Sequence, residues 1–418
     1  MEDQPGLVRR LGMTDAVVLG LGSMIGAGVF SVFGPAARAA GAGLLIGLGV
    51  AAAIAYCNAI ASAQLAAVYP TSGGTYIYGR ERLGPWWGFI AGWGFVVGKG
   101  ASCAAMALTV ASYAVPEPQW ARRTVALGTV ILLLALNYRG ITKTAILARI
   151  LLACTLIALA AVVIGIALAK PEPAQLMHWS TGTGYGVLQS AGLLFFAFAG
   201  YARLATMGEE VRDPVRTIPR GITLALAITV AIYLVVGMAA LLAAGPDRLA
   251  RAAAPLAEAV RAVDAPALVP VITVGAVVAS LGALLALIAG LGRTVLAMAR
   301  HRDLPGWLAA VHPRFRVPHH AEVAVGVVVC ILVATVDLRG TIGFSSFGVL
   351  IYYAVANAAA FTLPAADGTW WRRILNICGL GGCLLLIATL PWQSVIAGLA
   401  VFVVGITGRA VVLRRRTR

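Results

Sequence analysis

Long apolar runs recur along the whole chain, and they restrict its fold more than any other feature. A helix of about 20 apolar residues crosses the hydrocarbon core of a bilayer, where the backbone must satisfy its own hydrogen bonds. We therefore predict an all-α integral membrane protein with about twelve transmembrane helices in one domain, residues 1–418. The runs lie at 14–38, 43–68, 85–114, 123–138, 145–169, 184–206, 219–244, 266–298, 321–337, 341–363, 373–390 and 392–411.

The composition supports a protein that lives in a lipid bilayer. The chain has 418 residues, of which 60% are hydrophobic and 11% charged, whereas soluble proteins carry roughly 25% charged residues. The net charge of +16 does not indicate nucleic-acid binding, because the basic residues are spread between the apolar runs. The six cysteines lie inside these runs without metal-ligand spacing. We expect no metal and no cofactor.

The basic residues fall mainly in alternate connections between the runs. If the N-terminus is cytoplasmic, the cytoplasmic segments receive most of them, including Arg80, Arg149 and Arg300, and few fall outside, such as Arg251. Cytoplasmic loops are enriched in lysine and arginine. The pattern predicts a multi-pass protein of the cell membrane with both termini cytoplasmic.

Two of the predicted spans contain glycines where a helix should be continuous. The first contains GLGSMIGAGVF, with Gly20, Gly22, Gly26 and Gly28, and the sixth contains Gly200 within FFAFAGYARLATMGEE. Each glycine costs a helix interior about 1 kcal/mol relative to alanine. Paired breaks at equivalent positions of two repeats indicate a transporter site near the bilayer midplane. The alternative is that small residues let helices pack closely.

The corresponding repeats would be residues 14–169, with spans one to five, and residues 184–363, with spans six to ten. Residues 373–411 would add two further spans.

Lys99 is the only charged residue between Pro85 and Val115. A charge near the middle of a transmembrane helix costs at least ~2.5 kcal/mol and usually faces a polar cavity of functional importance. Lys99 is therefore a candidate functional residue. The alternative is a structural cation held by backbone carbonyls at the C-terminal end of a half-helix.

Four segments resemble the amino acid–polyamine–organocation transporter superfamily. They are GSMIGAGVF, YPTSGGTYIYGRERLGP, GEEVRDPVRTIPRGI and MARHRDLPGWLAAVHPRFRVP. Within the superfamily, the chain most resembles bacterial relatives of the cationic amino acid transporters. The resemblance implies a LeuT-like fold with a five-plus-five inverted repeat, discontinuous helices 1 and 6, and alternating access to a central amino-acid site.

The resemblance also implies roles for individual residues. The backbone N–H groups of Gly26, Ala27 and Gly28 would bind the substrate carboxylate. Phe198 would be an aromatic gate, Gly200 would lie in the second break, and Glu209 and Glu210 would belong to a cytoplasmic gate. The carbonyls that would receive the substrate ammonium are those of Ser23, Met24, Ile25, Phe196 and Ala199.

The chain departs from its cationic-transporter relatives at acidic positions. Gln64, Gly98 and Ala202 stand where those relatives tend to carry acids, and positive charges follow at Lys99 and Arg203. Arg203 is a candidate core charge or an ion-pair partner of the nearby glutamates. Like charges repel strongly at low dielectric. We therefore expect a neutral or acidic amino acid as substrate rather than a cationic one.

The coupling ion is predicted from the same region. Some relatives place a lysine where sodium binds in sodium-coupled members; Thr155 occupies that position here, and Ser280 is the mid-span hydroxyl of span eight. Burial disfavours the charged form of an amine, so Lys99 is a candidate proton site. Proton symport or exchange is expected in preference to sodium coupling.

Two other functional classes were weighed against secondary transport. An amino-acid sensor could keep the same binding fold without transporting its ligand. A membrane enzyme is disfavoured, because the predicted spans contain no acid–base cluster.

Overall fold

The computed structural model describes residues 12–69, 73–115, 117–139, 145–169, 182–201, 211–364 and 370–416. Every regular element in these ranges is a helix. The α-helices are α1 (Met13–Met24), α2 (Ala27–Ser31), α3 (Phe33–Ala40), α4 (Leu44–Val68), α5 (Gly74–Leu83), α6 (Pro85–Ala114), α7 (Gln119–Tyr138), α8 (Ala145–Leu168), α10 (Gly184–Phe198), α12 (Pro214–Arg251), α13 (Pro255–Ala262), α14 (Val269–Arg300), α15 (His319–Thr335), α16 (Leu338–Phe361), α17 (Trp370–Thr389) and α18 (Trp392–Arg416).

The described helices form a bundle of the kind that spans membranes. Ten helical stretches are long and apolar enough to cross a bilayer, and α10 and α15 are shorter apolar helices. The predicted all-helical, multi-pass architecture is confirmed. The count of twelve spans and the two-repeat arrangement stay predictions.

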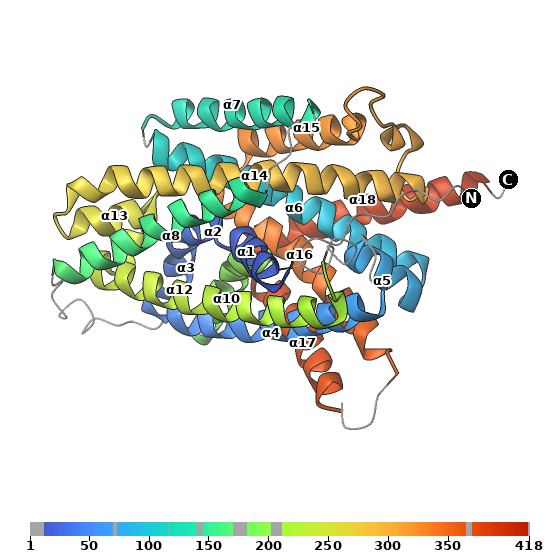
Figure 1. Cartoon of the computed structure of the whole chain (residues 1–418), viewed down its shortest axis with the longest axis horizontal. Helices are drawn as coiled ribbons and strands as arrows, with labels where there is room; N and C mark the ends of the chain where they lie inside the picture. The colour runs from blue at the N-terminus through green and yellow to red at the C-terminus, as the bar shows by residue number, and fades with distance from the viewer. Residues whose placement is uncertain are drawn as a thin grey trace.

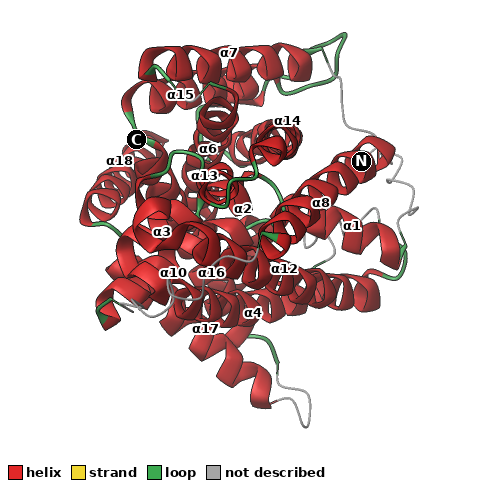
Figure 2. Cartoon of the chain, turned by 90° about the vertical axis from the view of Figure 1, so that its left-hand side faces the viewer, coloured by secondary structure: helices red, strands yellow, loops and turns green. Residues whose placement is uncertain are grey.

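Helices α6 and α16 are the most enclosed spans of the bundle. In each, 78% of the 18-residue apolar stretch is buried inside the protein, against 17% for α7 and α18. Figure 2 shows α7 and α15 as an outer layer on one side of this centre and α17 on the other. A residue in the middle of α6 is therefore held inside the protein and away from lipid.

Glycines bring the backbones of α6 and α16 into direct contact. A Cβ atom at Gly98 would lie 2.9 Å from the Ser345 carbonyl oxygen, and one at Gly348 would lie 2.8 Å from the Gly98 Cα. Small residues permit such close packing between membrane helices. Successive residues on a helix point about 100° apart. Lys99 therefore points away from the contact that Gly98 makes with α16.

The bundle has two distinct ends along its long axis. Helix α13 lies at the left end in Figure 1 and helix α5 at the right end. Near α13, the Tyr113 hydroxyl donates a hydrogen bond to the Phe30 carbonyl at 2.8 Å and accepts one from the Leu256 N–H at 3.3 Å. The short helix α2 is thereby tied to the segment that covers this end.

Candidate functional site

The first predicted span is interrupted between α1 and α2. Ile25 has φ −81° and ψ 64°, and the Gly26 N–H donates to the Met24 carbonyl at 2.8 Å. This geometry is an inverse γ-turn. The helix therefore stops at Met24 and restarts at Ala27, inside the segment where the glycines predict a break.

A second interruption follows α10. The helix ends at Phe198, and Ala199 leaves the helical conformation with φ −65° and ψ 4°. The turn continues through Gly200 to Tyr201. Residues 202–210 lie outside the described residues, and the predictions for Arg203, Glu209 and Glu210 lie there with them.

The two interruptions touch each other. The Ser23 hydroxyl lies 2.9 Å from the Gly200 carbonyl oxygen, and a Cβ atom at Gly200 would lie 2.1 Å from the Ser23 carbonyl oxygen. A Cβ at Gly28 would lie 2.8 Å from the Cα and Cβ of Ala197. These approaches require residues without side chains at positions 28 and 200.

Tyr233 of α12 bridges the same two interruptions. Its buried hydroxyl lies 2.7 Å from the Met24 carbonyl oxygen and 3.2 Å from that of Ala197. It therefore satisfies acceptors that the broken helices leave free, as a span must do inside a membrane.

Lys99 reaches the end of α10. Its side chain is buried, with 7% exposure, and Nζ donates a hydrogen bond to the Ala199 carbonyl at 2.8 Å. A cation is stabilised at the negative end of a helix dipole. Within the described ranges, Lys99 forms no ion pair with a carboxylate. Ala199 is one of the residues whose carbonyl, by the family resemblance, would receive the substrate ammonium.

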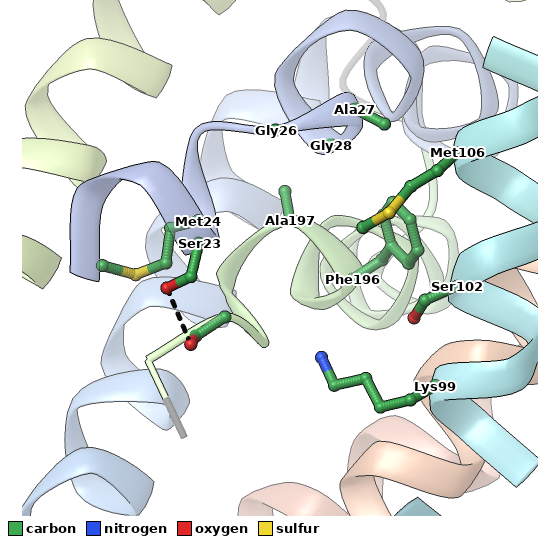
Figure 3. A pocket seen from close by; sticks show the side chains of 11 residues that line it. Ser23, Met24, Gly26, Ala27, Gly28, Lys99, Ser102, Met106, Phe196 and Ala197 are labelled. Atoms are coloured by element: carbon green, nitrogen blue, oxygen red, sulfur yellow. Dashed lines mark hydrogen bonds between the residues drawn. The ribbon is translucent and has the colours of Figure 1, made fainter. Parts of the chain in front are cut away.

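A small cavity lies at the junction of the broken helices (Figure 3). Its volume of about 20 Å³ leaves room for roughly one water molecule. The cavity is therefore too small to hold an amino acid. The lining residues are Ser23, Met24, Gly26, Ala27, Gly28, Lys99, Ser102, Met106, Phe196, Ala197 and Gly200.

Most of the predicted binding residues lie in or beside this cavity. Phe196 is an aromatic residue of its wall. Phe198 is fully buried, and its ring packs against Tyr233 with 5.2 Å between centroids. Ile25 forms the turn, and Ala199 contributes the carbonyl that Lys99 binds.

Three residues near the cavity were missed by sequence reasoning. Tyr233 bridges the breaks, Met106 lines the wall, and Ser102 forms a hydrogen bond with Ser345 at 2.7 Å. For Tyr233 and Ser102 the available signal was a hydroxyl group in the middle of an apolar run, whereas Met106 gave no signal. Such a signal is weaker than a charge, because a hydroxyl can also bond to its own helix backbone.

A multi-pass helical bundle whose broken helices enclose a small central cavity has the features of a membrane transporter. A sequence model of the family described as "Amino acid permease" matches residues 11–407. The chain belongs to this family. The predicted membership of the amino acid–polyamine–organocation superfamily is confirmed.

Three relatives of the chain are described as transporters or permeases. A transporter of Mycobacterium tuberculosis is 59% identical over 415 residues, which cover 99% of this chain and 93% of the relative. The branched-chain amino acid permease BcaP of Bacillus subtilis is 26% identical, with 96% and 92% coverage. Cationic amino acid transporter 4 of Homo sapiens is 28% identical, with 86% and 60% coverage. The protein is a transmembrane transporter of an amino-acid transport family, and not an enzyme.

Proposed function

We propose that the protein is a secondary active amino-acid transporter that works by alternating access and uses Lys99 as its coupling group. The observation that carries the proposal is the 2.8 Å hydrogen bond between Lys99 Nζ and the Ala199 carbonyl, inside the cavity formed by the two broken helices. The amine occupies an acceptor to which a substrate ammonium would bind. Substrate binding and the charge on Lys99 are therefore linked.

The cavity wall supports a neutral substrate in preference to a cationic one. Met106, Phe196 and Ala197 give it an apolar side, and Ser102 adds a hydroxyl. A second positive charge about 6 Å from Lys99 would be repelled by roughly 3 kcal/mol at an effective dielectric constant near 20. An acidic side chain would be attracted instead. The substrate is thus a neutral or acidic amino acid.

The proton is the proposed coupling ion. Lys99 is a titratable group within the cavity wall, and deprotonation would release the Ala199 carbonyl for the substrate ammonium. Sodium coupling has less support, because Ser280 and Thr155 supply single hydroxyls where a sodium site would need several oxygen ligands; the Thr155 hydroxyl already donates to the Leu151 carbonyl at 2.8 Å. The same cycle can run as proton symport or as amino-acid exchange.

Uptake by purified protein in proteoliposomes tests this function. Labelled neutral, acidic and cationic amino acids would be offered with and without an inward proton gradient. We expect saturable uptake of a neutral or acidic substrate that the gradient increases. Uptake driven by sodium, or of cationic substrates alone, would contradict the proposal.

Lys99→Ala tests the coupling group. Loss of a charged hydrogen bond is worth ~1.5–3 kcal/mol, so we expect gradient-driven uptake to fall about tenfold or more. The pH dependence of uptake should flatten. The melting temperature should stay close to that of the wild type, because the variant affects transport more than folding. Uptake at the wild-type rate with an unchanged pH profile would return Lys99 to a structural role.

Gly100→Ala is the matched control for that variant. Gly100 follows Lys99 on α6, and a Cβ atom there would meet no atom within 4 Å. We expect wild-type uptake from this variant.

A further inference from the structure

A seam of polar side chains lies between α4, α16 and α17, on the side of the bundle away from α7. Asn357 Nδ2 of α16 donates to Asn58 Oδ1 of α4 at 2.6 Å and to the Tyr353 carbonyl at 2.9 Å. The Cys383 thiol of α17 lies 3.4 Å from the same Asn58 oxygen. Asn58, Asn357 and Cys383 are all fully buried. The three helices thus meet through polar groups in the interior of a membrane protein.

Helix α17 extends this seam toward its own first turn. Asn376, Gly379 and Cys383 are spaced three and four residues apart and share one helix face. A Cβ atom at Gly379 would lie 2.3 Å from Asn357 Oδ1, so the α17 backbone approaches Asn357 directly. Asn376 is 1% exposed. It lies six residues after Trp370, about 9 Å along the helix from its beginning.

The other end of the seam reaches the candidate site. Tyr353 precedes Asn357 by one turn, and its hydroxyl lies 3.4 Å from the Ala199 carbonyl oxygen. The same oxygen accepts the hydrogen bond from Lys99. The Tyr201 ring stacks on Tyr353 with 5.0 Å between centroids. Polar groups therefore follow one another from Lys99 to Asn376.

Several atoms of the seam lack a hydrogen-bond partner among the described residues. They are Asn357 Oδ1 and both Nδ2 and Oδ1 of Asn376. A buried polar group without a partner costs ~1–3 kcal/mol. Buried water, which typically makes about three hydrogen bonds, is the usual remedy. The bond between Asn357 and Asn58 joins α16 to α4, but it leaves Asn357 Oδ1 and both polar atoms of Asn376 without a partner in the described part of the chain.

We propose that this seam holds a chain of water molecules that carries protons between Lys99 and the membrane face at which α17 begins. The Lys99 ammonium gives one proton to a neighbouring water and becomes a neutral amine; successive transfers deliver one proton to the aqueous phase. The asparagine amides orient the waters and are not themselves ionised. The groups beside Lys99 are Cys103, one turn along α6, and the Ala199 carbonyl with its Tyr353 hydroxyl.

This inference rests on the proposed proton coupling, and Asn376→Leu tests it separately. The substitution removes no hydrogen bond to a described residue, so the fold should be retained. Proton transfer through positioned groups contributes ~10²–10⁴ in rate, so we expect gradient-driven uptake to fall about tenfold or more. Exchange of labelled for unlabelled substrate needs no net proton movement and should stay near the wild-type rate. Asn376→Ser keeps a polar group with space for water and should preserve both activities.

Asn137→Leu is the matched control. Asn137 is also buried, but it lies on α7, outside the seam, with its amide donating to the Leu285 carbonyl at 3.1 Å. Loss of this hydrogen bond should lower the stability of the protein without changing the ratio of gradient-driven uptake to exchange.

The outcomes separate the two proposals. Wild-type protein that exchanges substrate but shows no gradient-driven uptake would overturn proton coupling itself. If Asn376→Leu keeps gradient-driven uptake at the wild-type level, the water route alone is overturned. A raised melting temperature of this variant would show in addition that the seam is dry. A parallel fall of uptake and exchange would also overturn the water route.

Discussion

Gly200 and Gly22 differ in what surrounds them, although both lie near the broken helices. A Cβ at Gly200 would lie within 2.1 Å of the Ser23 carbonyl oxygen, whereas one at Gly22 would meet nothing within 4 Å. The contact at Gly200 is with backbone, which cannot move aside as a flexible side chain can. Glycine is thus needed at position 200 for close approach, and at position 22 it only weakens the helix.

Opposite effects are therefore expected from the same change at these two positions. Gly200→Ala should separate the two breaks, lower the melting temperature by an amount equivalent to ~1–3 kcal/mol, and abolish most uptake. Gly22→Ala should be neutral or stabilising by up to ~1 kcal/mol. Melting curves and proteoliposome uptake measure both effects. Normal transport by Gly200→Ala would show that the breaks need not touch.

At the scale of elements, Asp303 joins parts of the chain that are far apart in sequence. Its carboxylate accepts from the Tyr76 hydroxyl at 2.7 Å, from Arg80 at 3.1 Å and from Arg409 at 2.7 Å. The Arg409 guanidinium also lies 4.4 Å from the Trp86 ring centroid. Burial and the bond to Asp303 raise the pKa of Tyr76, which keeps its hydroxyl neutral and donating. Helices α5, α6 and α18 are thereby tied to the loop after α14.

Arg409→Leu should show what this ion pair contributes. Both side chains are at most 5% exposed, and removal of one partner from a buried pair typically costs ~3–5 kcal/mol. We expect a clear fall in the melting temperature. The exposed pair between Arg216 and Asp213, at 3.9 Å, is the control, since Arg216→Ala should change stability by less than about 1 kcal/mol. Equal effects would contradict a special role for Asp303.

The sequence predicts features that depend on the residues of a single helix. The glycines weaken their own span and locate the break at Ile25, and the isolated charge marks Lys99. The bonds from Tyr233 to Met24 and from Asn357 to Asn58 could not be predicted, because their partners are 209 and 299 residues apart. Such contacts depend on which helix faces meet. Phe196 and Phe198 illustrate the same point, since a two-residue difference turns one ring to the cavity and the other to Tyr233.

At the scale of the whole molecule, α13 and the loop after α14 lie at opposite ends of the bundle (Figure 1). The basic residues of the sequence predict that the loop is cytoplasmic. Asp247, near the α13 end, and Arg302, in the loop, are both exposed. They are suitable positions for reporting which end faces the cytoplasm.

Cysteine labelling in whole cells tests this orientation. A membrane-impermeant maleimide should modify Asp247→Cys in intact cells and should modify Arg302→Cys only after lysis. The wild-type protein, which lacks the introduced cysteine, gives the background labelling of the native cysteines. The reverse pattern would invert the predicted topology.

The small size of the cavity around Lys99 has a kinetic consequence. About 20 Å³ cannot admit an amino acid, so each loading or release event waits for the broken helices to part. Substrate transit is then paced by a slow rearrangement of packed helices, of the μs–ms kind or slower, and not by diffusion. Turnover at saturating substrate should consequently depend steeply on temperature, with a similar activation energy for every substrate the site accepts.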